Sequence, residues 1–231
     1  MMTFDRDTQQ KVNFKRIYQV ANEILASSSV IETFPYKAKE LVHEQSDIVF
    51  CSFKKAAKYK INIKQFGSES AVLTELCGAF VLFYNQDEAI YRIRFSILHE
   101  FGHYILGHRM NLSMDNPLYA LQEIEANCFA AQLLMPEQLL RECMHRGKAI
   151  SVDFIRQSFD VSPDAAQRRK NTLAKNPYEW RSREEREYDD IIILRFASKL
   201  DEIAPKSNHY SYDYEEDFAR EEERNHWLYE R

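Results

Sequence analysis

The sequence has no uninterrupted apolar run that is long enough to cross a lipid bilayer. Its first residues, Met-Met-Thr-Phe-Asp-Arg-Asp, also lack the apolar stretch that forms the centre of a signal peptide. No internal repeat or low-complexity tract is present. We therefore expect a soluble, cytoplasmic protein.

The sequence also lacks an excess of positive charge and has no closely spaced pair of cysteines. The net charge is -5, which argues against a protein whose main task is to grip nucleic acid through its phosphates. The four cysteines are Cys51, Cys77, Cys128 and Cys143. No C-x-x-C pair occurs among them, and three of the four lie within apolar patterns. This usage is typical of buried free thiols in a reducing cytosol rather than of a disulfide framework.

The length of 231 residues and the hydrophobic content of 45% can fill a sizeable core. These values predict one domain, or one domain with an appendage. The character of the chain changes near Pro177, and after Pro205 it becomes rich in tyrosine and strongly acidic. We expect a domain over residues 1–175, with a helical C-terminal subdomain at about 137–175, and an accessory helix with an acidic, Tyr-rich tail over residues 176–231.

The most informative motif is the H-E-x-x-H stretch from His99 to His103. Residues four apart share one face of a helix, so the imidazoles of His99 and His103 can bind one metal ion. Glu100 is then placed to act as the general base of a metallopeptidase, taking a proton from water that the metal activates.

The context of this motif is helical. Apolar residues recur at helical spacing from Ile90 to Ile105, and no proline interrupts residues 89–108. Asp87 is the expected N-cap and Gly107 the expected stop. With the apolar stripe in a core, the two histidines lie on roughly the opposite face of the helix.

Catalytic zinc sites normally have three protein ligands, so one more is needed. His108 follows closely in the sequence, but on a continuing helix its side chain would point well away from His103. A better candidate lies in the segment 121–136, a strong helix former that Pro136 ends.

Within that segment, Glu123 and Asn127 are four residues apart and share one face. We expect Glu123 to be the third ligand and Asn127 to orient a ligand histidine from behind. Glu125 stays open as the alternative third ligand.

The two motifs, H-E-F-G-H and E-x-E-A-N-x-F-A-A-x-L-L-M-P, resemble the ImmA/IrrE family of bacterial and phage metallopeptidase-like proteins. The resemblance covers about residues 15–175. It implies that this part of the chain is a zinc metallopeptidase-like domain. By position it implies that His99, His103 and Glu123 are zinc ligands and that Glu100 is catalytic.

The resemblance also implies a function. The family contains proteases that cleave helix-turn-helix repressors of mobile elements, together with regulators for which proteolysis is less well established. We expect a zinc-dependent metalloendopeptidase that cleaves a cytosolic regulatory protein, a helix-turn-helix repressor of a mobile or phage element, and so takes part in transcription regulation. The alternative is a metal-dependent regulator that binds a repressor or DNA without cutting.

We expect an α+β fold: a zincin-like core with a small, mostly antiparallel sheet packed on the H-E-x-x-H helix and surrounded by further helices. Strands are expected at 48–53 and 78–84. Additional helices are expected at 14–26, 36–43, 137–145, 152–159 and 162–174.

The last two of these helices resemble a helix-turn-helix, which would place Arg168, Arg169 and Lys170 on its second helix. We prefer the interpretation that the two helices pack over the peptidase core, because a DNA reader presents more positive charge than this acidic chain has. Direct nucleic-acid binding is therefore not expected, and neither is a membrane partner.

A zinc peptidase also needs a donor for the oxyanion of its tetrahedral intermediate. Tyr104 and Arg92 are candidates for this role or for a substrate contact, and so are Tyr119 and His145. The sequence does not choose among them.

Overall fold

The computed structural model describes residues 12–109, 112–175 and 182–206. Its helices are α2 (Phe14–Ser27), α3 (Ala38–Gln45), α4 (Phe53–Lys58), α5 (Ile90–Ile105), α6 (Pro117–Leu134), α7 (Glu137–His145), α8 (Val152–Phe159), α9 (Pro163–Lys175), α10 (Arg183–Arg195) and α11 (Ala197–Ile203), with a 3-10 turn at Ile63–Phe66. The strands are β1 (Val49–Ser52), β2 (Ala71–Leu76) and β3 (Ala79–Tyr84). The expected α+β class is confirmed.

The three strands form one small mixed sheet in the order β1-β3-β2. β2 pairs with β3 antiparallel over six positions, and β1 pairs with β3 parallel over four. Antiparallel pairing therefore predominates as expected, although one edge strand is parallel. Cys77 and Gly78 both have positive φ in the two-residue turn between β2 and β3, which is the turn that closes a tight hairpin.

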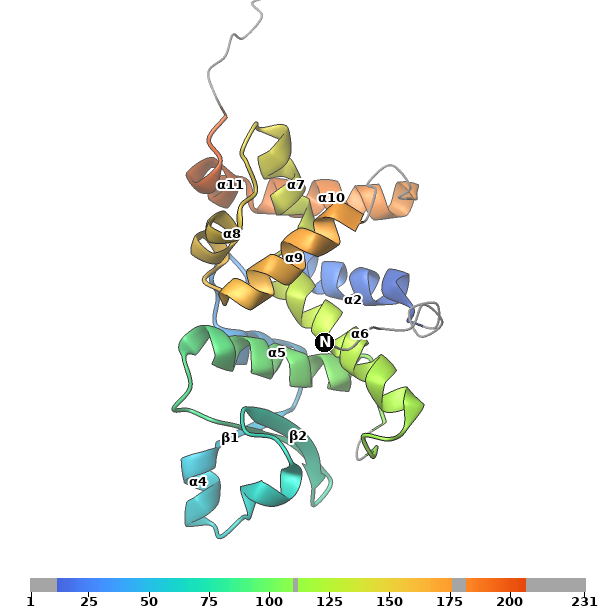
Figure 1. The fold of residues 1–231 in the computed structure, drawn as a ribbon, viewed down its shortest axis with the longest axis vertical. Coiled ribbons are helices and arrows are strands. Elements are labelled where there is room, and N and C mark those ends of the chain that lie inside the picture. The colour runs from blue at the N-terminus through green and yellow to red at the C-terminus, as the bar shows by residue number, and fades with distance from the viewer. Residues whose placement is uncertain (1–11, 110–111, 176–181, 207–231) are drawn as a thin grey trace, which may run out of the picture.

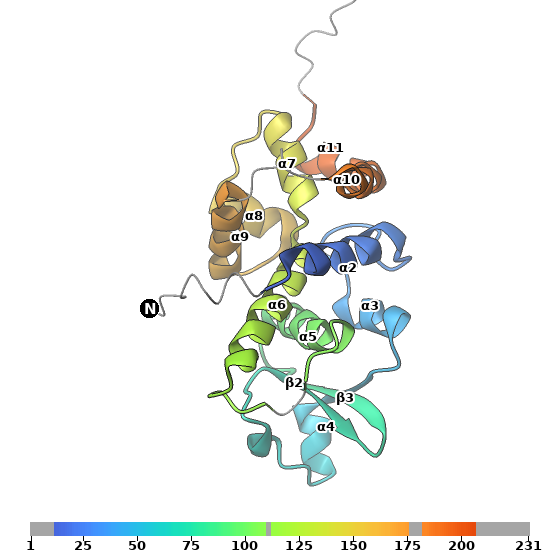
Figure 2. The ribbon, with the colours of Figure 1, turned by 90° about the vertical axis from the view of Figure 1, so that its right-hand side faces the viewer.

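α5 lies across the middle of the molecule, with the sheet and α4 on one side and most of the other helices on the other, while α6 crosses it (Figures 1 and 2). Its buried side chains include Ile97, Leu98 and Phe101, so the predicted apolar stripe does face the core. The helix begins at Ile90 with Ala89 at the N-cap. The prediction that Asp87 caps it is wrong, because the Asp87 carboxylate binds Lys54 at 2.6 Å instead.

α5 and α6 approach closely at Gly102. A Cβ at this position would lie 3.0 Å from Phe129 Cδ1 and 3.2 Å from Ala126 Cα, both on α6. Only a glycine leaves room for this crossing without displacing a neighbour. The crossing sets how near the polar face of α6 comes to that of α5.

α7, α8 and α9 occupy the positions predicted for them and pack together at the end of the molecule that lies away from the sheet (Figure 1). The buried Arg169 of α9 donates hydrogen bonds to the backbone oxygen of Met135 at 2.8 Å and to the side chain of Gln132. Its guanidinium therefore stabilises the fold and does not face solvent, as a DNA contact would require.

α10 and α11 follow in the same hydrophobic core. Ile192, Phe196 and Leu200 are buried in one cluster with residues of α2, α7 and α9. The accessory helix expected after residue 175 is thus two helices joined at Phe196. The division of the chain near residue 175 stays a prediction, and the expected tail, residues 207–231, lies outside the described residues.

All four cysteines are free, but they are not all buried as expected. Cys51 and Cys143 are buried and Cys128 is half-buried, whereas Cys77 is exposed in the tight β2–β3 turn. The positive φ that this turn needs turns the residue out of the sheet. None of the helices in the described part of the chain combines the length and the apolar content that crossing a bilayer requires.

Candidate metal centre

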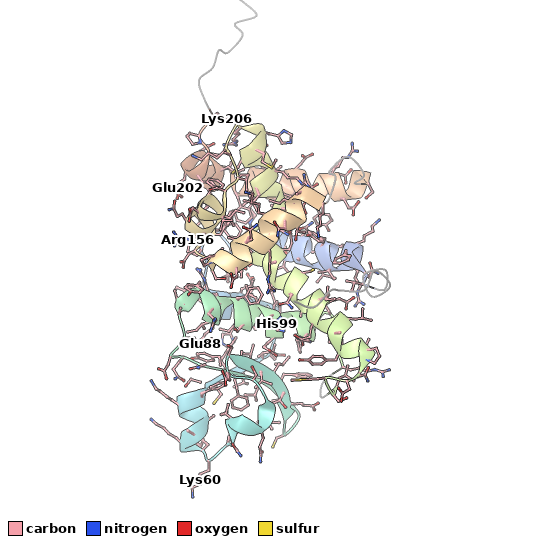
Figure 3. All side chains as sticks on the ribbon, in the orientation of Figure 1. Lys60, Glu88, His99, Arg156, Glu202 and Lys206 are labelled. Atoms are coloured by element: carbon pink, nitrogen blue, oxygen red, sulfur yellow. The ribbon has the colours of Figure 1, made fainter. Side chains whose placement is uncertain are left out.

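Two histidines on α5 point their Nε2 atoms toward one spot. His99 and His103 are one turn apart on the face opposite the buried stripe, and their Nε2 atoms lie 3.1 Å from each other. Figure 3 marks His99 on α5, at the level where the helices meet the sheet. The i, i+4 spacing alone accounts for this convergence.

α6 brings a carboxylate to the same spot. Glu123 lies 3.4 Å from His99 Nε2 through one oxygen and 3.3 Å from His103 Nε2 through the other. The ligand atoms of the three residues all lie within 4.8 Å of one another. The structure thus brings together the three residues that the sequence nominated as metal ligands.

The outward ring nitrogen of His99 faces an acceptor. His99 Nδ1 lies 3.2 Å from Asn127 Oδ1, so it carries the proton and donates it to the amide oxygen. The lone pair of His99 is then left on Nε2, which faces Glu123. This is the tautomer that a metal-binding histidine with an orienting partner adopts.

His103 is oriented by a relay of two further side chains. Its Nδ1 lies 3.0 Å from His108 Nδ1, and His108 Nε2 lies 3.0 Å from Glu125 Oε2. The carboxylate can only accept, so His108 donates from Nε2 and accepts from His103 at Nδ1. The lone pair of His103 is therefore also left on Nε2, toward Glu123.

This relay corrects the expectation that His108 points away from the site. The helix ends at Ile105, and Gly107 adopts a left-handed conformation with φ 71°. The turn at Gly107 reverses the chain and returns the His108 ring to His103. It also places Glu125, the alternative third ligand, on His108 instead of in the ligand cluster.

The donor set fits zinc. Two neutral imidazole nitrogens and one carboxylate are a common protein ligand set in catalytic zinc sites, which keep a further position open. In their neutral form both imidazoles present an unprotonated Nε2, because their Nδ1 atoms face acceptors. The residues therefore suit zinc both in their types and in having Asn127 and His108 as acceptors behind the two imidazoles.

The charges within the cluster favour positive charge at the Nε2 atoms, and with no metal bound a proton supplies that charge. Burial works against ionisation of Glu123, but its hydrogen bonds to His103 and His99 outweigh burial and hold its pKa well below the usual range. Burial likewise opposes protonation of His99, but the hydrogen bond to Glu123 and the charge of Glu100 raise its pKa overall. The cluster therefore keeps Glu123 ionised, and a metal ion bound there would replace the proton that an imidazole shares with this carboxylate.

Glu100 is held beside the cluster by the sheet. Its Oε2 accepts a hydrogen bond of 2.9 Å from the backbone N–H of Leu73 on β2. Burial raises the pKa of Glu100 against the opposing effects of His99 and His103. A carboxylate with a raised pKa is better matched to proton transfer near neutral pH.

A cavity of about 450 Å³ opens onto the cluster. His99, Glu100, His103 and Glu123 line it together with Tyr119, whose hydroxyl hydrogen-bonds to Glu123. Burial and the Glu123 charge raise the pKa of Tyr119, so the phenol keeps its proton.

The other candidates for an oxyanion donor lie elsewhere. Tyr104 packs edge-on against Phe80 with ring centroids 5.0 Å apart, and His145 is exposed on α7. Arg92 lies 3.7 Å from Glu88 and lines a neighbouring groove, not this cavity. Of the four candidates, only Tyr119 lines the cavity.

The sequence did not predict two contacts of the site, that of His108 with His103 and that of the Leu73 backbone N–H with Glu100. The signal for His108 was Gly107, which predicted a helix stop but not the direction of the chain after it. Leu73 lies on β2, and the sequence does contain a pattern typical of that strand. Cys77-Gly78 between two apolar runs is a hairpin pattern, which would have predicted β2.

The sequence model of the family Peptidase_M78, described as the IrrE N-terminal-like domain, matches residues 44–171, more than half of the chain. This range begins in α3 and ends in α9, so it includes the sheet and every side chain of the cluster described above. No curated protein sequence matches the chain at a significant level.

Proposed function

Because the chain belongs to the IrrE N-terminal-like family, Peptidase_M78, a family of metallopeptidases, we propose that it is a zinc-dependent endopeptidase. The observation that carries the proposal is the convergence of His99 Nε2, His103 Nε2 and the Glu123 carboxylate, with acceptors behind both imidazoles. In this proposal the three residues hold Zn²⁺, and Asn127 orients His99.

When bound, zinc supplies Lewis-acid chemistry, polarising the scissile carbonyl and making water acidic near neutral pH. Glu100 accepts the proton of the attacking water and passes it to the leaving amine. The Leu73 N–H holds one oxygen of this carboxylate, which leaves the other oxygen for proton transfer. Tyr119 is the side chain we propose as the oxyanion donor, because its protonated hydroxyl lines the cavity.

We propose that the substrate is a cytosolic regulatory protein, a helix-turn-helix repressor of a mobile or phage element. The choice of a repressor as substrate follows from the family resemblance. The physical support is the net charge of -5, because an acidic enzyme meets a basic, DNA-binding protein faster than a neutral one would.

The first test concerns the metal. We expect one zinc per chain at neutral pH and its loss in His99→Ala and His103→Ala, measured by elemental analysis after gel filtration. Glu123→Ala should retain less zinc than Glu125→Ala, because Glu125 reaches the site only through His108. Full zinc in the His99→Ala/His103→Ala double variant would refute the metal centre.

The second test concerns the chemistry. Glu100→Gln should keep zinc and fold normally while losing proteolysis. Co-expression with a helix-turn-helix repressor encoded next to this chain should give fragments with wild type and an intact repressor with Glu100→Gln. An intact repressor that leaves its operator with both forms would instead support the non-proteolytic regulator.

A further inference from the structure

An apolar groove lies next to the metal cavity, on the side toward α9. Its volume is about 500 Å³, which is within the range of protein pockets that bind organic ligands. Its walls come from α5, α6, α9 and the start of α2, and its floor consists largely of apolar side chains that are buried or half-buried. Apolar residues that line it include Phe95, Ala131, Leu134, Met135 and Ala165.

The groove is continuous with the metal cavity. Phe95 and Asn127 line both spaces. The Phe95 ring stacks on the His99 ring with centroids 6.3 Å apart, and the Asn127 amide bonds the same ring. A chain that leaves the metal cavity past these two side chains therefore enters the groove directly.

The continuity follows from the helices themselves. On α5 the face that carries His103 and His99 continues, at steps of four residues, to Phe95 and Tyr91. On α6 the face of Glu123 and Asn127 continues in the same way to Ala131, which also lines the groove. Each helix is thus polar at the metal and apolar one to two turns further along the same face.

Concave, mostly apolar spaces of this volume with a few polar groups at the edge are typical of ligand-binding sites in proteins. The rim is polar, with the exposed side chains of Arg92, Asp164 and Arg168. A groove with an apolar base and a polar rim is complementary to an extended peptide, whose apolar side chains are buried in the base while its backbone stays near water.

We propose that this groove binds an apolar segment of the protein substrate, beside the bond that is cleaved. The proposal rests on the proposed endopeptidase function and deepens it, since it names what the enzyme recognises. At a rise of 1.5 Å per residue along α5, Phe95 and Tyr91 lie about 6 and about 12 Å from His99. An extended chain advances about 3.3 Å per residue, so the recognised side chains lie about two to four residues from the cleaved bond.

The test uses two short unstructured peptides of Gly, Ser and Lys, one with two adjacent Phe residues and one with Ser in their place. Binding is measured by fluorescence anisotropy to the Glu100→Gln protein, which leaves the peptides uncut. Two groove-filling variants are made in that background, Ala165→Phe on α9 and Ala131→Phe on α6. Ala174→Phe is the matched control, because Ala174 is exposed on α9 and does not line the groove.

We expect the Phe peptide to bind about tenfold more tightly than the Ser peptide, as the burial of a bulky apolar side chain implies. Ala165→Phe and Ala131→Phe should each remove this preference, and Ala174→Phe should keep it. Equal binding of the two peptides would overturn the proposal, and so would a preference that survives both filling variants. A bound apolar dye that the Phe peptide fails to displace would assign the groove to a small molecule and also overturn it.

Cleavage is read separately. Protein with Glu100 intact should cut the Phe peptide about two to four residues from the Phe pair, a spacing set by the rise of an extended chain. Cuts with no fixed spacing would overturn the placement of the groove. A groove-dependent preference in binding without any Glu100-dependent cleavage would refute the endopeptidase function and leave the groove as a peptide-binding site.

Discussion

Each histidine of the α5 pair uses its two ring nitrogens for different tasks. The Nε2 atoms converge on Glu123, and the Nδ1 atoms face Asn127 and His108. A side chain that fixes the outward nitrogen therefore fixes which nitrogen is free for a metal. His108 and Glu125 lie behind His103 in such an orienting position, outside the cluster of His99, His103 and Glu123.

We expect His108→Ala to weaken zinc binding about tenfold, because loss of an orienting partner typically costs 10- to 100-fold in affinity. The measurement is a zinc titration against a chromophoric chelator. His108→Asn should recover part of the affinity, since its amide oxygen can accept from His103. An unchanged zinc affinity in His108→Ala would show that the relay does not orient His103.

Glu44 gives a second prediction at this scale. Its carboxylate opposes the cost of burial with hydrogen bonds from Ser28 and Ser29, and its pKa is lowered to about 2 from 4.5. A lowered folded-state pKa stabilises the fold above pH 4.5 and loses that contribution as the pH falls from 4.5 to about 2.

Glu44→Gln should therefore lower the free energy of unfolding at pH 7 by about 1 kcal/mol, a value reduced for the exposure of the carboxylate. Urea denaturation at several pH values should show the difference from wild type vanish near pH 2. Glu40→Gln on the same helix is the control, and a loss of equal size there would refute the assignment to Glu44.

The sequence predicted the local part of this geometry and missed the long-range part. His99 and His103 meet because of helical spacing, which a sequence displays directly. The return of His108 depends on the turn at Gly107, and the bond from Leu73 to Glu100 depends on how a strand docks on α5. Both require tertiary packing that no local pattern records.

At the scale of elements, the crossing of α5 and α6 governs the site. Three polar side chains on two helices meet only because Gly102 lets Ala126 and Phe129 come close. The apolar periodicity predicted α5, and the helix-forming composition before Pro136 predicted α6. Neither signal predicted β2, a strand of six residues that is stabilised by pairing with β3.

Gly102→Ala sets two effects against each other. Alanine is favoured over glycine in a helix by about 1 kcal/mol, whereas overpacking a core contact costs about 1–3 kcal/mol. The Cβ would lie 3.2 Å from the Ala126 backbone, which cannot rotate away, so we expect a net loss of stability and weaker zinc binding. Urea denaturation checks the first effect and chelator competition the second. A variant more stable than wild type would show that α6 moves freely and that the crossing is not tight.

At the scale of the whole molecule, α10 and α11 contribute buried side chains to the same hydrophobic cluster as the preceding helices. Phe196 lies edge-on to Phe34, 5.0 Å between centroids, and Phe34 precedes α3 near the other end of the described chain. The composition change near residue 176 predicted an accessory helix and tail; it did not predict which apolar side chains of that helix are buried, because charge density is visible in a sequence and tertiary burial is not. A core that draws on both ends of the chain predicts one cooperative unit.

Phe196→Ala should lower the free energy of unfolding by about 3–5 kcal/mol, as truncation of a buried aromatic side chain does. Leu194→Ala, two residues away but 78% exposed, should change it by no more than about 0.5 kcal/mol. Chemical denaturation followed by tryptophan fluorescence and circular dichroism should give one transition. Two separate transitions would show that residues 182–206 unfold on their own.

The tight turn between β2 and β3 has a practical consequence. Burial raises the pKa of Cys51, and it raises the pKa of Cys128 and of Cys143 to about 11, so these thiols react slowly. Cys77 is exposed and should be alkylated first. A fluorophore coupled there would sit at the tip of the hairpin whose strand holds Glu100, and its emission would report on motions of that strand when a peptide arrives.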